Sequence, residues 1–200
     1  MRKLLTYFSL LLFIGGGILL LLGGWQIYHE HTSVERALEE AKEKAMQHGE
    51  ENTARVDQRS YKERMNFTKG DMIGILSIPA IDKELPIVEG TEEDELDKGV
   101  GHYSITALPG DPNQILLAGH RNTVFTGLDQ LQPGSEIMVQ MPYGMFTYIM
   151  THTKIVDAHD TSIIKTSLTE EELVISTCYP FNYIGDAPER YIIYAYPAPK

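Results

Sequence analysis

The chain has 200 residues and a formal net charge of −11 at pH 7. This length accommodates one ordinary domain plus an appendage, and a hydrophobic content of 42% excludes a wholly disordered chain. The acidic balance argues against nucleic acid as a partner, because phosphate backbones are bound by basic surfaces. The single cysteine excludes an intramolecular disulfide and a zinc site built from cysteine clusters.

A membrane anchor is predicted at the start of the chain. Residues 4–24 carry no charged side chain, and as a helix they would extend about 31 Å, enough for a hydrocarbon core of about 30 Å. Arg2 and Lys3 precede this stretch and the next Lys or Arg is Arg36, so the positive-inside bias places the N-terminus in the cytoplasm and the remainder outside the cell membrane. We therefore expect residues 1–3 as a cytoplasmic tail and residues 4–24 as a single transmembrane signal anchor.

A cleaved signal peptide is the alternative for this stretch. Its apolar part usually has about 7–15 residues and precedes a small-residue cleavage site. Here the apolar part is longer, and Gly24-Trp25-Gln26 fits such a site poorly. Trp25 and Tyr28 instead suit a membrane interface, which favours the uncleaved anchor.

Residues 25–66 are expected to form a juxtamembrane helix and a linker. Thr32 followed by Glu35 fits a capping box at a helix start. One narrow helical face would carry Val34, Leu38, Ala41 and Ala45. The charges of both signs around this face favour a solvated spacer, and a regulatory arm packed on the domain is the alternative. Three histidines of this segment are expected to be solvated rather than to bind metal: His29, His31 and His48.

A β domain is predicted over residues 67–200, and this part of the chain carries its net negative charge. They contain 8 Lys and Arg against 19 Asp and Glu, which accounts for the whole of the −11. Apolar runs alternate with Gly, Pro and Asp, a pattern typical of an all-β barrel or sandwich. A hairpin turn is expected at 142–144 and a short helix at 126–131. Strands are expected at Met72–Ile78, Leu85–Val88, Asn113–Ala118, Glu136–Met141, Phe146–Val156, Leu173–Thr177 and Tyr191–Tyr196.

Cys178 is the first candidate for chemistry, because a lone cysteine outside the membrane is unusual. It ends the apolar run 173–178, and Pro180 breaks the strand soon afterwards, so a rigid strand end would present the thiol to a groove. The thiolate is the reactive form, hence a nucleophilic cysteine needs a base or a cationic partner. The alternative is a small buried hydrophobic side chain, and this residue alone leaves both roles open.

His120 and Arg190 are the candidate partners of this thiol. His120 ends a second strand-like run, and Gly119 before it allows another backbone to approach closely. Arg190 opens the last expected strand, which in an antiparallel arrangement begins beside the end of the strand bearing Cys178. A guanidinium there could stabilise the oxyanion of acyl transfer. Taken singly, His120 could be a structural histidine and Arg190 could pair with Glu189 at the surface.

Together these positions resemble the sortases, the membrane-bound cysteine transpeptidases of Gram-positive bacteria. The short anchor and residues 118–125 are most similar to class D sortases of bacilli. Ile175 stands where the family usually has Leu, and the resemblance covers about residues 70–198. Four stretches carry it in order along the chain: Gly101-His102-Tyr103 with Ala107-Leu108-Pro109-Gly110, Leu117-Ala118-Gly119-His120-Arg121, Val174-Ile175-Ser176-Thr177-Cys178 and Glu189-Arg190-Tyr191.

The resemblance implies a closed eight-stranded β-barrel with short helices. It also implies that Cys178 attacks the carbonyl between Thr and Ala or Gly in an LPxTA- or LPxTG-type sorting signal of a secreted protein, forming a thioester. An amine of a lipid-linked peptidoglycan precursor would then resolve the thioester. In this scheme His120 is the acid and base, Arg190 binds the acyl oxygen, and Thr177 positions the substrate backbone.

No cofactor and no metal are expected. The acidic run 92–95 with Asp97 could bind calcium, but calcium loops place their oxygen ligands at set spacings and no EF-hand pattern occurs, so a solvated loop or helix start is expected. Two other classes of function stay open. One is an extracytoplasmic cysteine peptidase that releases its product to water, and the other is a non-catalytic cell-wall binding module tethered to the membrane.

Overall fold

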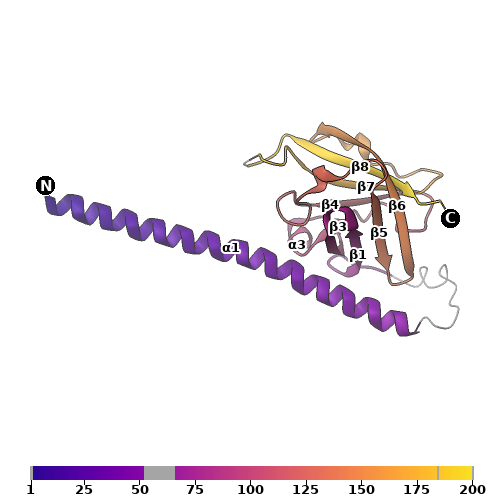
Figure 1. Cartoon of the computed structure of the whole chain (residues 1–200), viewed down its shortest axis with the longest axis horizontal. Coiled ribbons are helices and arrows are strands. Elements are labelled where there is room, and N and C mark those ends of the chain that lie inside the picture. The colour runs from indigo at the N-terminus through magenta and orange to yellow at the C-terminus, as the bar shows by residue number, and fades with distance from the viewer. Residues whose placement is uncertain (1, 52–65, 184, 200) are drawn as a thin grey trace.

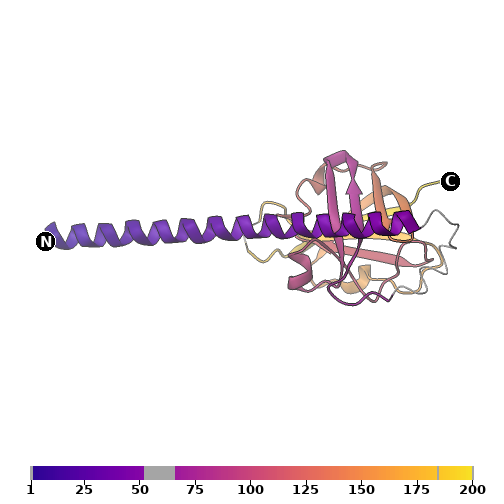
Figure 2. The ribbon, with the colours of Figure 1, turned by 90° about the horizontal axis from the view of Figure 1, so that it is seen from below.

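A long helix and a small β-barrel make up the computed structural model, which describes residues 2–51, 66–183 and 185–199. The helix, α1 (Arg2–Glu51), lies along one side of the barrel with its C-terminal part and projects away from it with its N-terminal part (Figure 1 and Figure 2). The helix start predicted at Thr32 is wrong, because the residues before Thr32 are already helical and the backbone continues through it.

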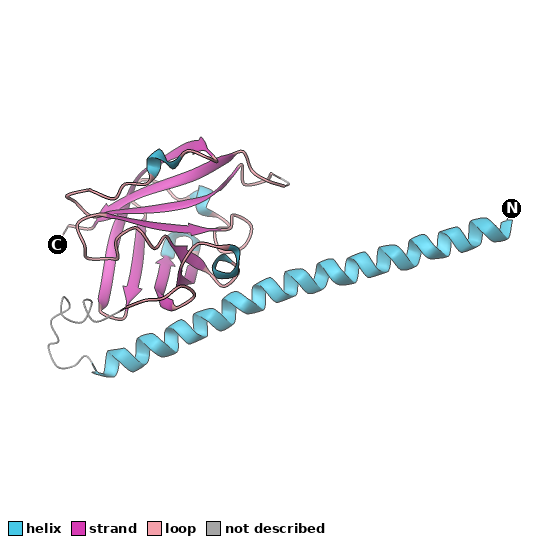
Figure 3. Ribbon diagram, turned by 180° about the vertical axis from the view of Figure 1, so that it is seen from behind, coloured by secondary structure: helices cyan, strands magenta, loops and turns pink. Residues whose placement is uncertain are grey.

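Eight strands close the barrel, as the resemblance implied (Figure 3). Their order around it is β1-β2-β3-β4-β7-β8-β6-β5, with β1 paired to β5. The pairs β2–β3 and β4–β7 are parallel and the other pairs are antiparallel. The strands are β1 (Met72–Ile78), β2 (Lys83–Glu89), β3 (Val100–His102), β4 (Gln114–Gly119), β5 (Glu136–Met141), β6 (Gly144–Asp157), β7 (Glu172–Tyr179) and β8 (Glu189–Pro197).

Short helical turns occupy several of the connections. They are η1 (Pro79–Ile81), α3 (Glu93–Leu96), η2 (Leu128–Gln130) and η3 (Thr161–Ile163). The expected helix start in the acidic run is confirmed by α3, whose Glu92 and Glu95 form a reciprocal capping box. The expected hairpin is confirmed too, since Met141 of β5 pairs with Gly144 of β6.

Alternation along the strands separates two apolar clusters. In β7, Leu173 and Ile175 face the barrel interior, where they join the large core, and Val174 between them faces outward. The outward cluster consists of Leu116, Val156, Ile163, Val174, Ile192 and Tyr194. It forms an apolar strip across the outer face of β4, β7 and β8, partly covered by η3.

The middle of α1 packs on the barrel. Ala37 and Ala41 are buried, and Val34 contacts the barrel core. Because alanine side chains are small, this face of the helix can approach the barrel closely, which the charge pattern did not reveal. The packing differs from the solvated spacer expected here. The predictions for four other residues of this region concern side chains outside the described ones: His29, His31, Ala45 and His48.

The N-terminal part of α1 exposes large apolar side chains. Those described there belong to residue 7 and residues 11–25, and they include Phe13, 83% exposed, and Leu20, 80% exposed. Over the part of the chain that the structure describes, no helix combines the length and the apolarity that crossing a membrane requires.

Candidate active site

A pocket of about 750 Å³ lies at the end of the barrel where β7 ends and β8 begins. The three side chains predicted from the sequence, Cys178, His120 and Arg190, all line it. Strand pairing accounts for their meeting, since Cys178 is directly opposite Arg190, and Gly119, which precedes His120, is opposite Thr177. The fold therefore gathers a thiol, an imidazole and a guanidinium from three strand ends.

Cys178 is a free, half-buried cysteine on the outer face of β7. It shares this face with Val174, so the outward apolar strip leads along β7 to the thiol. A half-buried thiol at a strand end is accessible from the pocket yet fixed by the sheet. This placement favours the nucleophile over the alternative of a small buried core residue.

Arg190 is held by the backbone that leads into β8. Its Nη1 donates to the carbonyl oxygens of Ala187 at 3.2 Å and of Glu189 at 3.0 Å. The guanidinium thus bonds the main chain of Glu189, in place of the ion pair with the Glu189 carboxylate that was its alternative. A planar group oriented in this way can direct its other N–H donors toward a neighbouring acyl oxygen.

His120 lies between the barrel end and α3, with its side chain 28% exposed. Its Nε2 is 3.7 Å from Oε1 of Glu93, an exposed carboxylate that also lines the pocket. The preceding Gly119 was expected to admit a neighbouring backbone, but two side chains approach it instead. A Cβ at this position would lie 2.7 Å from atoms of Val124 and of Phe125. The imidazole is therefore placed by tight packing beneath the strand end.

Thr177 does not line the pocket in the way predicted for substrate positioning. Its side chain is 3% exposed, and its hydroxyl donates to the carbonyl oxygen of Gly119 at 2.7 Å. Alternation explains this, because the side chain next to an outward Cys178 must face inward. The hydroxyl ties the end of β7 to the end of β4, so it supports the position of His120. A contact of Thr177 with substrate stays a prediction.

Arg121 has a role that the sequence did not reveal. Its Nη2 donates to the backbone oxygens of Tyr183 at 2.7 Å and of Gly185 at 3.1 Å, both in the β7–β8 connection. The residue after His120 thus holds the β7–β8 connection, whose residues Gly185 and Asp186 line the pocket. The position of Arg121 next to the predicted His120 could have drawn attention to it. Its partners are backbone atoms, however, and a sequence pattern does not indicate such contacts.

One group of side chains in this region has the composition of a cation site. The ligand atoms of Glu93, Asp97 and His120 lie within 4.8 Å of one another. Both carboxylates are exposed, and acidic groups gather in this way at surfaces without binding metal. We assign no metal to them.

Known proteins match this chain in sequence and in fold. The sortase domain family matches residues 76–198. Sortase D of Bacillus subtilis strain 168 is 46% identical over 174 residues, which cover 86% of this chain and 88% of that protein. The structure of a Clostridium perfringens sortase D5 transpeptidase matches with a TM-score of 0.69 at 29% identity, over 84% of this chain and 99% of that one. Sortase E1 of Streptomyces coelicolor, solved with a tripeptide in the active site, matches with a TM-score of 0.59 at 26% identity, over 67% and 92% of the two chains.

A thiol, an imidazole and a guanidinium at one end of a closed barrel are the kinds of groups that cysteine-based acyl transfer needs. The chain belongs to the sortase family. Its similarity to the B. subtilis sortase D, which extends over most of both proteins, places it in class D.

Proposed function

We propose that this sortase cleaves an LPxTA- or LPxTG-type sorting signal between Thr and Ala or Gly, and transfers the secreted protein to an amine of a lipid-linked peptidoglycan precursor. The observation that carries the proposal is the shared pocket of Cys178, His120 and Arg190. Three groups of the kinds that acyl transfer needs, a nucleophile, a proton carrier and an oxyanion donor, converge there.

The reaction has two acyl-transfer steps. Sγ of Cys178 attacks the threonine carbonyl carbon, the C–N bond breaks, and His120 supplies the proton that the departing amine takes up. The incoming amine then attacks the thioester carbonyl, the C–S bond breaks, and His120 accepts the proton from the amine. In both steps the guanidinium of Arg190 stabilises the negative charge on the acyl oxygen.

The surroundings of the pocket support both substrates. The pocket is lined by apolar as well as charged side chains, and Ala158, Ala187 and Pro188 offer apolar contacts for the Leu and Pro side chains of a sorting signal. Asp157 and Asp186 line the same pocket, and their negative charge attracts a protonated amine.

We further propose that residues 4–24 anchor the enzyme as a single span, with the N-terminus in the cytoplasm and the catalytic domain facing the cell wall. The support is the uncharged 21-residue stretch, its basic flank at Arg2 and Lys3, and the exposure of the apolar side chains in α1. Such side chains need an apolar surrounding that the barrel does not provide.

The test uses the full-length protein in detergent micelles with LPxTA and LPxTG peptides, with and without a second peptide that offers a free amine. Mass spectrometry should find the product joined to the amine, and a thioester adduct on the wild type that Cys178→Ala lacks. Release of the product to water alone, even with the amine present, would identify a peptidase instead. Turnover retained by a folded Cys178→Ala protein would exclude the cysteine mechanism.

A further inference from the structure

Helix α1 connects the proposed membrane span to the catalytic barrel without a break. The helix extends from Arg2 to Glu51, and the same helix that exposes its apolar side chains over residues 11–25 packs on the barrel over residues 33–42. A continuous helix transmits position and direction over its length, since its rise is about 1.5 Å per residue. The span and the barrel are therefore not independent bodies.

Polar contacts hold the packed segment at both of its ends. Oγ of Ser33 donates to the backbone oxygen of Asp97, which follows α3, at 2.9 Å. About two and a half turns further along, Nζ of Lys42 lies 2.7 Å from Oε2 of Glu84 on β2. The buried side chain of Ala37 lies between these contacts. Contacts at two points along a helix prevent it from pivoting on the barrel.

The packed segment reaches the active site at its membrane-proximal end. Val34 lines a cavity of about 130 Å³ together with His120 and Glu93. In Figure 1, β8 begins at the barrel end that faces the N-terminal part of α1, and Arg190 lies at that start of β8. The catalytic pocket thus opens at the end of the barrel nearest the proposed span.

We propose that α1 is a rigid stand that holds the catalytic pocket facing the membrane at a fixed height, so that the enzyme acts on substrates that are themselves held in the bilayer. This inference rests on the proposed function and on the proposed anchor. Ten residues separate Gly24, at the end of the proposed span, from Val34, which lines the small cavity beside His120, and this sets the height at about 15 Å.

A fixed height matters because both proposed substrates are membrane-bound on this view. A sorting signal that is followed by an apolar segment still in the bilayer presents its scissile bond close to the surface, and a lipid-linked amine is confined to the same layer. Holding the pocket within that layer raises the effective concentration of each substrate at Cys178. Moving the pocket away by more than the reach of the substrate removes this gain entirely.

The experiment changes the height and leaves the pocket intact. A helical heptad inserted after Trp25 lengthens the stand by about 10 Å and nearly preserves the helical phase. The same heptad inserted after Glu51 is the matched control, because the contacts at Ser33 and Lys42 precede it and the height stays unchanged. Both proteins and the wild type are placed in phosphatidylethanolamine–phosphatidylglycerol vesicles.

Each protein is assayed with two probes. One is a soluble sorting-signal peptide, and the other is the same motif followed directly by an apolar transmembrane segment in the same vesicles. The insertion after Trp25 should lower cleavage of the membrane-held probe at least fivefold relative to the soluble one, and the insertion after Glu51 should leave this ratio within twofold of the wild type. Equal ratios for the three proteins, or an equal loss in both insertions, would overturn the stand.

A second pair of variants tests the packing itself. Ala37→Arg with Ala41→Arg places two cations in the buried face and should lower the same ratio several-fold, whereas Glu35→Arg with Glu39→Arg on the exposed face should leave it unchanged. An unchanged ratio in the first variant contradicts the inference. Two measurements on the wild type test the proposals on which the inference rests. Failure to cleave the soluble probe would overturn the proposed function, and failure to stay with the vesicles would overturn the proposed anchor.

Discussion

Arg190 is oriented by two backbone carbonyls and lies opposite Cys178 on the neighbouring strand. Arg190→Lys replaces a planar fork of donors with a point charge on a flexible stem, so the oxyanion loses an oriented donor. We expect kcat and kcat/KM to fall together by about 10²–10³-fold, as for the loss of one oxyanion-hole donor. Steady-state kinetics with a sorting-signal peptide measure this.

Glu189→Gln is the matched control for this prediction. It removes the carboxylate that was the alternative partner of Arg190 and keeps the backbone oxygen that Arg190 contacts. Near-normal rates are expected, since Arg190 is held by backbone oxygens that this change keeps. An Arg190→Lys enzyme within a few fold of the wild-type rate would remove Arg190 from the mechanism, and Arg121→Lys would be the next variant to measure.

Thr177 joins the strand ends that lead to Cys178 and His120 through a buried hydrogen bond. Thr177→Val keeps the shape of the side chain and leaves the carbonyl of Gly119 without this donor. We expect the free energy of unfolding to fall by about 1–3 kcal/mol, the cost of an unsatisfied buried polar group. Thr177→Ser retains the hydroxyl and should lose less. Denaturant titrations compare the three proteins, and equal stability of the Val variant and the wild type would contradict the role.

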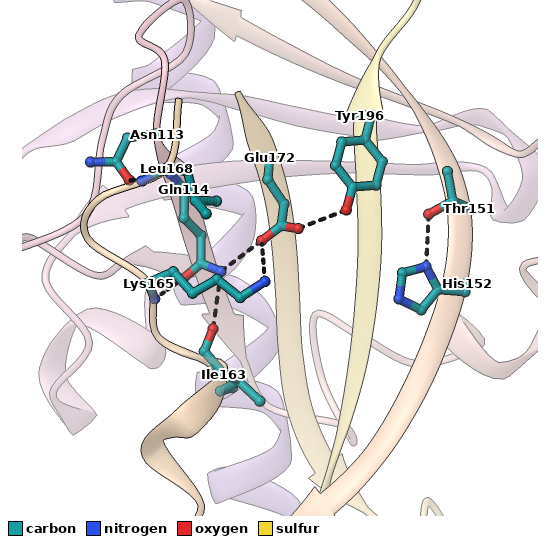
Figure 4. A network of polar contacts seen from close by, with 9 residues as sticks. All are labelled: Asn113, Gln114, Thr151, His152, Ile163, Lys165, Leu168, Glu172 and Tyr196. Carbon is teal, nitrogen blue, oxygen red and sulfur yellow. Dashed lines mark hydrogen bonds and ion pairs between the residues drawn. The ribbon is translucent and has the colours of Figure 1, made fainter. Parts of the chain in front are cut away.

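Among the elements, β7, β8 and β4 are also joined at the end away from the pocket. The buried Glu172 at the start of β7 accepts hydrogen bonds from Nε2 of Gln114 at 2.9 Å and from the hydroxyl of Tyr196 at 2.8 Å (Figure 4). Nζ of Lys165 lies 3.6 Å from the same carboxylate. The three strands are thus joined by polar contacts at the end away from the pocket. At the pocket end they are joined by the hydrogen bond of Thr177 to Gly119 and by the pairing of Cys178 with Arg190.

This network predicts an alkaline weakening of the fold. The hydrogen bond to the Glu172 carboxylate, with burial, raises the pKa of Tyr196 to about 12, from an ordinary value of 10.0. Between these values the folded chain keeps a proton that the unfolded chain has lost, so the free energy of unfolding falls as pH rises from about 10 to about 12. Tyr196→Phe should make that fall smaller.

Denaturant midpoints measured from pH 9 to pH 12 check this prediction. Tyr183→Phe, at a tyrosine whose side chain is 47% exposed, is the control and should follow the wild type. The same dependence on pH in Tyr196→Phe and in the wild type would contradict the assignment to Tyr196.

The pattern of apolar residues in the sequence predicted most of the strands. It did not predict a strand that is short and lacks this pattern. All seven expected strands are present, because each is a short apolar-rich run bounded by turn residues. β3 was missed because it has three residues, and its Gly101 and His102 give no apolar alternation. The three catalytic candidates were predicted because each ends or begins a strand. The inward turn of Thr177 and the backbone partners of Arg121 depend on strand register, which the sequence alone did not supply.

On the scale of the whole molecule, the anchor and the chemistry are separable. A chain starting at residue 32 keeps the contacts of Ser33 and Lys42 with the barrel. We expect it to process soluble sorting-signal peptides within about twofold of the full-length rate and to fail in attaching proteins to the cell wall, because effective concentration at the membrane is lost. Peptide kinetics and cell fractionation measure the two effects. The full-length sequence is expressed in the same cells. Recovery of its product from the medium with an N-terminus beyond Gly24 would show cleavage and contradict the anchor.

The parallel pairing of β4 with β7 also has a consequence for folding kinetics. Thr177 and Gly119 are hydrogen-bonded across 58 positions of the chain, and parallel neighbours can pair only after the whole crossover has formed. Such distant contacts carry a loop-closure cost and form late in folding. The thiol consequently meets its imidazole only when the barrel is nearly complete. On the proposed anchoring and function, a chain that crosses the membrane unfolded carries a cysteine that is not yet activated, and refolding experiments should recover activity with the slowest phase of barrel formation.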